Sequence, residues 1–151
     1  MRPLVQGWKK TLPSDVSFRE VPALFREEWR IHGQLFFTLK ALGLGDDVDD
    51  AVYHSIHVDG NRLNTREDQV NFVKRFGVSE ADFDKAHNSF GVRNQLRQAD
   101  AFIRGADIPG VPTLVINGKY RLSAGSAGGQ DELLKVAEFL IKKERDQKKN
   151  P

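Results

Sequence analysis

Hydrophobic and polar positions along the chain follow two periods, one typical of helices and one typical of strands. Residues 4–12 carry apolar side chains at helical spacing, which predicts the end of a helix. Residues 15–22 alternate apolar β-forming side chains with polar ones, so a short strand is predicted there. Between residues 23 and 42 the apolar positions return every three or four residues, which predicts a long amphipathic helix.

A block of further helices is predicted after this long one. Two of them open with a capping box, in which a hydroxyl side chain precedes an acidic residue by three positions, as in Thr65-x-x-Asp68 and Ser79-x-x-Asp82. The predicted helices of this block cover residues 46–57, 65–76, 79–87 and 89–104.

The pattern changes where prolines first interrupt the helical block. The segment 108–112 contains two prolines and cannot form a regular helix. It leads into the apolar run 113–116, which predicts a buried strand, and Asn117-Gly118 is a strong hairpin signal. The remaining predicted elements are a returning strand, a flexible connection and a final helix, over residues 119–122, 123–129 and 130–143.

The charge is mixed, and this argues against nucleic acid as a partner. The 23 basic and 21 acidic residues give a formal net charge of +2. No apolar run approaches the roughly 20 residues that span a bilayer. The first residues are not followed by the apolar core of a secretory signal, so no signal peptide is expected within this sequence.

Candidate chemistry is sparse, because the sequence contains no cysteine and four histidines. Disulfides, thiolate metal sites and thiol chemistry within the chain are therefore excluded. His32, His54, His57 and His87 match no zinc signature. His54 and His57 lie three apart on a predicted helix but have no third ligand nearby, so surface histidines are the expectation. We predict no catalytic residue, metal site or cofactor.

Three segments nevertheless carry a specific resemblance. GVPTLVINGKYRL (110–122) is similar almost word for word to a segment of the DsbA-like thioredoxin-fold family of periplasmic thiol:disulfide oxidoreductases. HGQLFFTLKALG (32–43) resembles the first inserted helix of that family, and HNSFGV (87–92) resembles the junction of two later helices. The resemblance covers nearly all of residues 3–147. It implies an α/β fold, an incomplete thioredoxin-like fold with an inserted α-helical subdomain.

The resemblance also implies a site and a division of the chain. In the family the bond corresponding to Val111-Pro112 is cis, the backbone of Val111 would pair with extended substrate, and Pro112 would keep that edge open. Val111, Pro112 and Thr113 are therefore the expected substrate-binding residues, although by spacing alone Pro109 and Pro112 could merely shape a turn. The implied divisions are a thioredoxin-like remnant, a helical insertion and a second thioredoxin-like part, over residues 1–23, 24–104 and 105–151.

The departure from the family concerns its reactive motif. Members carry Cys-x-x-Cys at the start of the first thioredoxin helix, and residues 3–12 match only the later part of that helix. The expectation is a thiol:disulfide interchange protein present as a cysteine-free truncation that is inactive in thiol exchange, so enzymatic activity stays open. Its implied partners are unfolded or extended polypeptides and a membrane redox protein, and its implied location is the periplasm.

Two other functions remain open. One is a non-catalytic module that binds peptides at the proline loop. The other is a relative of the kappa-class glutathione transferases and their bacterial isomerase relatives, although Gly118-Lys119-Tyr120 is closer to the DsbA-like pattern. In either case the predicted strands 16–21 and 113–116 would lack the neighbour that lies between them in the family. Unpaired edges of this kind favour self-association.

Overall fold

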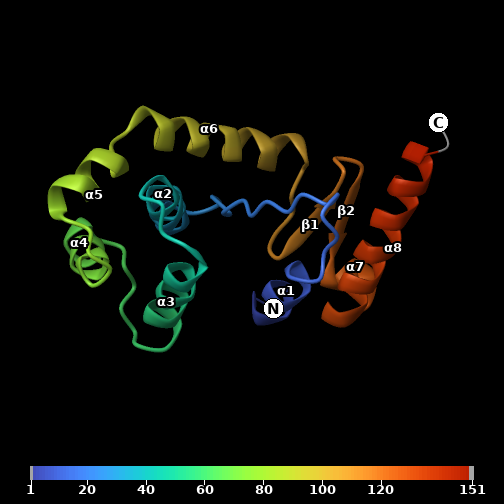
Figure 1. The fold of residues 1–151 in the computed structure, drawn as a ribbon, viewed down its shortest axis with the longest axis horizontal. Helices are drawn as coiled ribbons and strands as arrows, with labels where there is room; N and C mark the ends of the chain where they lie inside the picture. The colour runs from blue at the N-terminus through green and yellow to red at the C-terminus, as the bar shows by residue number, and fades with distance from the viewer. Residues whose placement is uncertain (1, 150–151) are drawn as a thin grey trace. The chain divides into compact units, whose positions relative to one another are not determined.

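A computed structural model describes residues 2–149, which form two compact units (Figure 1). The terminal unit comprises residues 2–20 and 103–149, and the helical unit comprises residues 21–102. Each unit has its own hydrophobic core.

The sheet of the terminal unit is a two-stranded antiparallel hairpin. Strand β1 (Thr113–Ile116) pairs with strand β2 (Tyr120–Ser123), with Leu114 opposite Leu122. Asn117 and Gly118 have φ values of 53° and 69°, and the Lys119 N–H donates a 2.9 Å hydrogen bond to the Ile116 carbonyl. Positive φ at both central residues is what a type I′ turn requires, so the predicted Asn-Gly hairpin is confirmed.

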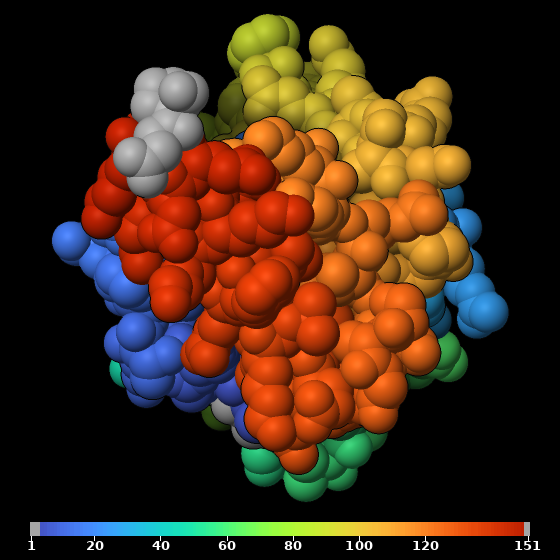
Figure 2. All heavy atoms as spheres, turned by 90° about the vertical axis from the view of Figure 1, so that its right-hand side faces the viewer, coloured from blue at the N-terminus to red at the C-terminus, as the bar shows by residue number. Residues whose placement is uncertain are grey.

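Helix α8 (Gln130–Lys149) covers this hairpin and contacts both strands (Figure 1). Figure 2 shows α8 in red beside the orange hairpin segment. The predicted final helix is confirmed but continues beyond residue 143, because the lysine-rich and glutamate-containing end is a good helix former. Helix α1 (Arg2–Lys9) completes the core, which contains Trp8, Phe18, Leu114, Ile116, Leu122, Leu134 and Ala137.

The strand predicted over residues 15–22 is wrong. Residues 16–24 are neither helix nor strand, and among residues 2–149 no segment pairs with them. The alternation reflects one-sided burial instead, since the Phe18 ring packs edge-on against Trp8 with centroids 6.3 Å apart. Alternation selects a buried face, whereas a strand also needs a hydrogen-bonded neighbour.

The flexible connection predicted over residues 123–129 is also wrong, because this segment contains the short helix α7 (Ala124–Ala127). Ser123 and Ser126 form a reciprocal capping box: each hydroxyl accepts a hydrogen bond from the other residue's N–H, at 3.0 and 3.2 Å. Gly128, with φ of 93°, ends the turn. Two serines three positions apart thus order a segment whose glycines suggested a loose loop.

The helical unit contains the predicted block of helices, which is confirmed with shifted ends. Its first helix begins four residues later than predicted, after Leu24 has packed close to Gly33. The core is formed mainly by Leu35, Leu39, Leu63, Val73 and Phe83. None of the helices described between residues 2 and 149 is long and apolar enough to cross a membrane. The helices are α2 (Glu27–Ala41), α3 (Asp46–His57), α4 (Arg66–Lys74), α5 (Glu80–His87) and α6 (Phe90–Gly105).

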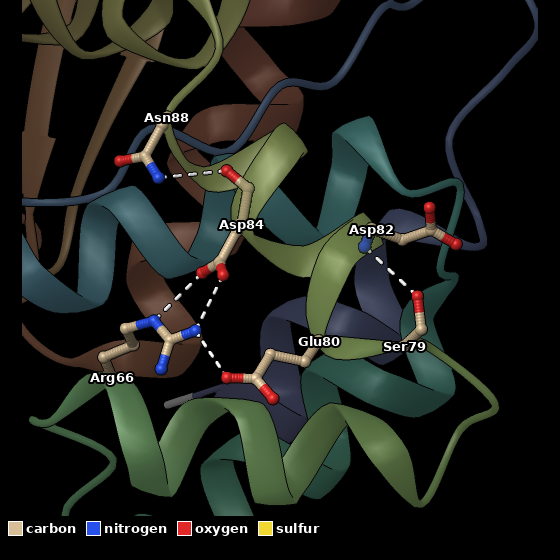
Figure 3. A network of polar contacts seen from close by, with 6 residues as sticks. All are labelled: Arg66, Ser79, Glu80, Asp82, Asp84 and Asn88. Carbon is tan, nitrogen blue, oxygen red and sulfur yellow. Dashed lines mark hydrogen bonds and ion pairs between the residues drawn. The ribbon is translucent and has the colours of Figure 1, made fainter.

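Helices α4 and α5 are joined by ion pairs on their exposed sides (Figure 3). The Arg66 guanidinium donates to both carboxylate oxygens of Asp84, at 3.0 and 2.7 Å, and to Glu80 at 2.7 Å. The hydrogen bonds from Arg66 to Asp84 lower the pKa of the Asp84 carboxyl below its usual value. The predicted caps are also confirmed, because the hydroxyls of Thr65 and Ser79 each accept the N–H three residues later.

Candidate functional site

The candidate site is the proline loop that links α6 to β1 in the terminal unit. The loop leaves the helix through Asp107, which has a left-handed φ of 56°. Hydrogen bonds from the N–H groups of Asp107 and Ile108 to the carbonyls of Arg104 and Ile103, at 3.2 and 3.1 Å, close the helix end. The helix thus ends at a single residue in the left-handed conformation, Asp107. This end sets the direction in which the chain approaches the sheet.

Val111 and Pro112 occupy the exposed part of this loop. Their peptide bond is cis, the isomer that the resemblance implies. The Val111 side chain is 56% exposed, a high value for an aliphatic residue next to a strand. Within residues 2–149, Val111 makes no backbone hydrogen bond, and Pro112 has no N–H to donate. The backbone amide and carbonyl of Val111 therefore remain available to another chain.

Thr113 anchors the other end of the loop. Its hydroxyl donates a 2.7 Å hydrogen bond to the Gly110 carbonyl across the cis bond. Thr113 is also the first residue of β1 and lies opposite Ser123 of β2. The three residues predicted as the site, Val111, Pro112 and Thr113, thus form one exposed turn whose last residue is fixed to the sheet.

Arg121 is the residue of this site that sequence reasoning missed. It lies in β2 opposite Val115, and its Nη1 donates hydrogen bonds to the carbonyls of Ala106, at 3.2 Å, and Asp107. The Arg121 side chain therefore ties the start of the proline loop to the hairpin. No local pattern signals this contact, because it joins positions 14 and 15 residues apart through the hairpin register.

The second edge of β1 is unpaired within the described chain. Strand β1 pairs with β2 along one edge, and no other segment between residues 2 and 149 pairs with it. Peptide groups on an unpaired edge can pair with another extended chain. The exposed turn at Val111 leads directly into this strand, so the two features form one continuous backbone surface.

Glu144 supports the hairpin from α8. One of its carboxylate oxygens accepts hydrogen bonds from the Lys119 ammonium at 2.9 Å and from the Asn117 amide at 3.0 Å. The hydrogen bonds from Lys119 and from the Asn117 side-chain amide lower the pKa of the Glu144 carboxyl. The hairpin turn is therefore held by the same helix that covers the sheet.

All four histidines lie in the helical unit. His32 contacts the Arg62 carbonyl at 2.7 Å, and His54 lies 3.3 Å from the Asp59 carboxylate. His87 stacks on Phe83, and burial lowers the pKa of its imidazole. No group of three or more potential ligands among the described residues could hold a metal ion.

The proline loop could therefore pair with an extended chain, but it offers no thiol nucleophile. Hydrogen bonds from the backbone of an extended chain would supply affinity, and the exposed Val111 side chain would add apolar contact. Thiol exchange requires a thiolate, and the sequence contains no cysteine.

Comparison with known proteins identifies the family of this chain. A profile of the DsbA-like thioredoxin domain family matches residues 15–140. The thiol:disulfide interchange protein DsbA of Azotobacter vinelandii is 46% identical over 143 residues, which are 95% of this chain and 67% of that protein. The DsbA of Pseudomonas aeruginosa is 43% identical over 143 residues, which are 95% of this chain and 68% of that protein.

Solved structures extend the likeness to three dimensions. A crystal structure of a P. aeruginosa DsbA variant has a TM-score of 0.92 at 42% identity, covering 96% of this chain and 78% of that one. The DsbA of Xylella fastidiosa shares the fold at 24% identity, with a TM-score of 0.88, covering 96% of this chain and 78% of that one. The predicted class, an α/β thioredoxin-like fold with a helical insertion, is confirmed. The chain belongs to the DsbA-like thioredoxin domain family.

Proposed function

We propose that the chain binds extended polypeptides non-covalently at Val111, Pro112 and Thr113, as the peptide-binding part of a thiol:disulfide interchange protein. One observation carries this proposal: Val111 is exposed and has no backbone partner among the described residues, in a turn fixed by Arg121 and Thr113. Main-chain pairing of this kind suits unfolded substrates, because it depends little on their side chains.

A related protein supports the choice of ligand. The DsbA of Proteus mirabilis, 23% identical with a TM-score of 0.76, has a structure with a non-covalently bound peptide of sequence PWATCDS. Its match covers 91% of this chain and 77% of that one, so the shared fold includes most of both chains. We take that peptide as the first probe for this chain.

We further propose that this chain does not by itself exchange thiols and disulfides, because it has no cysteine to form a mixed disulfide. Family membership supports a periplasmic location and a membrane redox partner as parts of the same proposal. It also supports assigning residues 24–104 to a helical insertion between thioredoxin-like parts at 1–23 and 105–151.

The binding experiment uses fluorescence anisotropy with a fluorescein-labelled PWATCDS peptide in which serine replaces cysteine. This replacement prevents disulfides between peptide molecules, since the chain itself has no cysteine. Binding to the wild-type chain is expected, with at least roughly tenfold weaker binding by Val111→Asp, because a charge next to the exposed turn disfavours apolar contact. Val58→Asp is the matched control, since Val58 is an exposed valine of the helical unit, and it should bind normally.

Two results would contradict the proposal. One is absence of saturable binding by a folded wild-type chain, with folding checked by circular dichroism. The other is equal weakening by Val111→Asp and Val58→Asp, which would show that the added charge acts away from the proline loop. Thiol exchange is tested separately with reduced ribonuclease A, whose reoxidation rate should not change when the chain is added.

We also propose that the unpaired edge of β1 mediates self-association. An open strand edge pairs readily with an extended segment of another copy. Analytical ultracentrifugation over a hundredfold concentration range should detect a dimer whose fraction rises with concentration. A monomer throughout that range would refute this part of the proposal and leave the peptide-binding part standing.

A further inference from the structure

The proline loop is fixed at its two ends by different side chains. At its exit, the Thr113 hydroxyl binds the Gly110 carbonyl. At its entry, Arg121 of β2 binds the carbonyls of Ala106 and Asp107. The exposed Val111 lies between these two anchors, so its position relative to β1 depends on both.

At the entry of the loop, Arg121 must hold a residue in an unfavourable backbone conformation. Asp107 has a left-handed φ of 56°, a region that residues other than glycine rarely occupy. A left-handed residue in this position persists when surrounding contacts hold it. The guanidinium supplies such contacts, because hydrogen bonds from a charged donor are stronger than neutral ones. Arg121 is also fixed in its own strand by pairing opposite Val115.

We propose that Arg121 is a positioning residue for peptide binding: it holds the carbonyls of Ala106 and Asp107 and thereby aligns the Val111 backbone with the edge of β1. This inference rests on the proposed function. Arg121 does not contact the ligand in this scheme. It preorganises the loop, so that less conformational entropy is lost between residues 106 and 112 when peptide binds.

The test compares three arginine variants by peptide affinity and by amide hydrogen exchange. Arg121→Gln removes the charged donor, and Arg121→Lys keeps a charge with fewer donors. Arg104→Gln is the matched control, because Arg104 carries the same charge close to the loop and its exposed side chain has no hydrogen bond to another described residue. Anisotropy with the serine-substituted PWATCDS probe gives the dissociation constant.

Arg121→Gln should weaken peptide binding roughly threefold to tenfold, because its two hydrogen bonds order the loop without contacting the peptide and only part of their free energy affects binding. Arg121→Lys should recover part of that loss, and Arg104→Gln should bind like the wild type. In Arg121→Gln the amides of Asp107 and Ile108, which close the helix end, should exchange faster. The Lys119 amide in the hairpin turn should keep its protection, which a general loss of stability would not allow.

The outcomes separate this inference from the function on which it rests. If the wild type binds the peptide and Arg121→Gln binds it equally well, Arg121 does not position the site, and peptide binding stands. Equal weakening by Arg104→Gln would also overturn the inference, because charge alone would then explain the effect. If the wild type does not bind, the proposed function fails. Unchanged exchange at Asp107 and Ile108 in Arg121→Gln would then overturn the loop-positioning role as well.

Discussion

The Arg145 guanidinium and the Asp15 carboxylate form a two-pronged ion pair, with donor to acceptor distances of 2.7 and 2.8 Å, between residues 130 positions apart. It connects the end of α8 to the segment that follows α1, within the terminal unit. The hydrogen bond from Arg145 is the main cause that lowers the pKa of Asp15 below its ordinary value of 3.8. The pair thus links the stability of this unit to acidic pH.

Asp15→Asn should lower the melting temperature slightly at pH 7, where the wild-type carboxylate is ionised. A carboxyl with a depressed folded-state pKa stabilises the fold above its unfolded pKa and loses that effect as pH falls through the folded value. The difference between wild type and Asp15→Asn should therefore shrink as pH falls below 3.8. A difference that persisted after full protonation would show that charge pairing is not its source. Circular dichroism melts at several pH values measure it.

Phe83→Ala should destabilise the helical unit by about 3–5 kcal/mol, the usual cost of emptying a buried phenylalanine site. Phe83 is fully buried in the core of that unit. Phe139→Ala makes the same chemical change at a side chain that is 65% exposed, and it should leave the free energy of unfolding nearly unchanged. Urea titrations followed by tryptophan fluorescence and circular dichroism give both values. Similar costs for the two variants would contradict the assigned burial.

Gly118→Ala should destabilise the hairpin by about 1–2 kcal/mol, because its φ of 69° is left-handed and a Cβ is disfavoured there. Gly7→Ala is the control, since Gly7 is helical and a Cβ would meet no atom within 4 Å. Alanine there should be neutral or stabilise by up to about 1 kcal/mol. Chemical denaturation of both variants checks the sign. A stabilising Gly118→Ala would rule out the turn conformation described above.

His87→Gln should reduce the loss of stability that occurs on mild acidification. Burial lowers the pKa of His87 below its ordinary value of 6.5, so the folded state disfavours the charged ring. Stability from the neutral ring is complete above 6.5 and declines as pH falls from there through the lowered folded pKa. Melting temperatures between pH 7.5 and pH 5 should fall less steeply for His87→Gln than for wild type. An equal slope for His87→Gln and wild type would contradict this role of His87.

Sequence reasoning succeeded where local chemistry determines the structure. The hydroxyl caps at Thr65 and Ser79 marked helix starts, and Asn117-Gly118 marked the hairpin turn. Each of these signals acts within a few residues. The family resemblance then supplied the fold class and the exposed turn at Val111, which periodicity alone left open between a binding surface and a simple bend.

The wrong strand and the missed arginine both concern interactions between distant positions. Val16 and Phe18 alternate with polar residues as in a strand, but pairing depends on a partner that local sequence cannot reveal. Arg121 reaches the carbonyls of Ala106 and Asp107 only through the hairpin register. In contrast, the Ser123 and Ser126 capping box was local and was missed because the surrounding glycines suggested a flexible connection.

The terminal unit is built from two separate stretches of chain, with the whole helical unit between them in the sequence. During synthesis the helical unit is complete once residue 102 has left the ribosome, so it can fold while the rest is still being made. Trp8 and Phe18 of the first stretch lack their core partners on α8, such as Leu134 and Ala137, until that helix has been synthesised. The core around Trp8 can therefore form only after the helical unit has been synthesised.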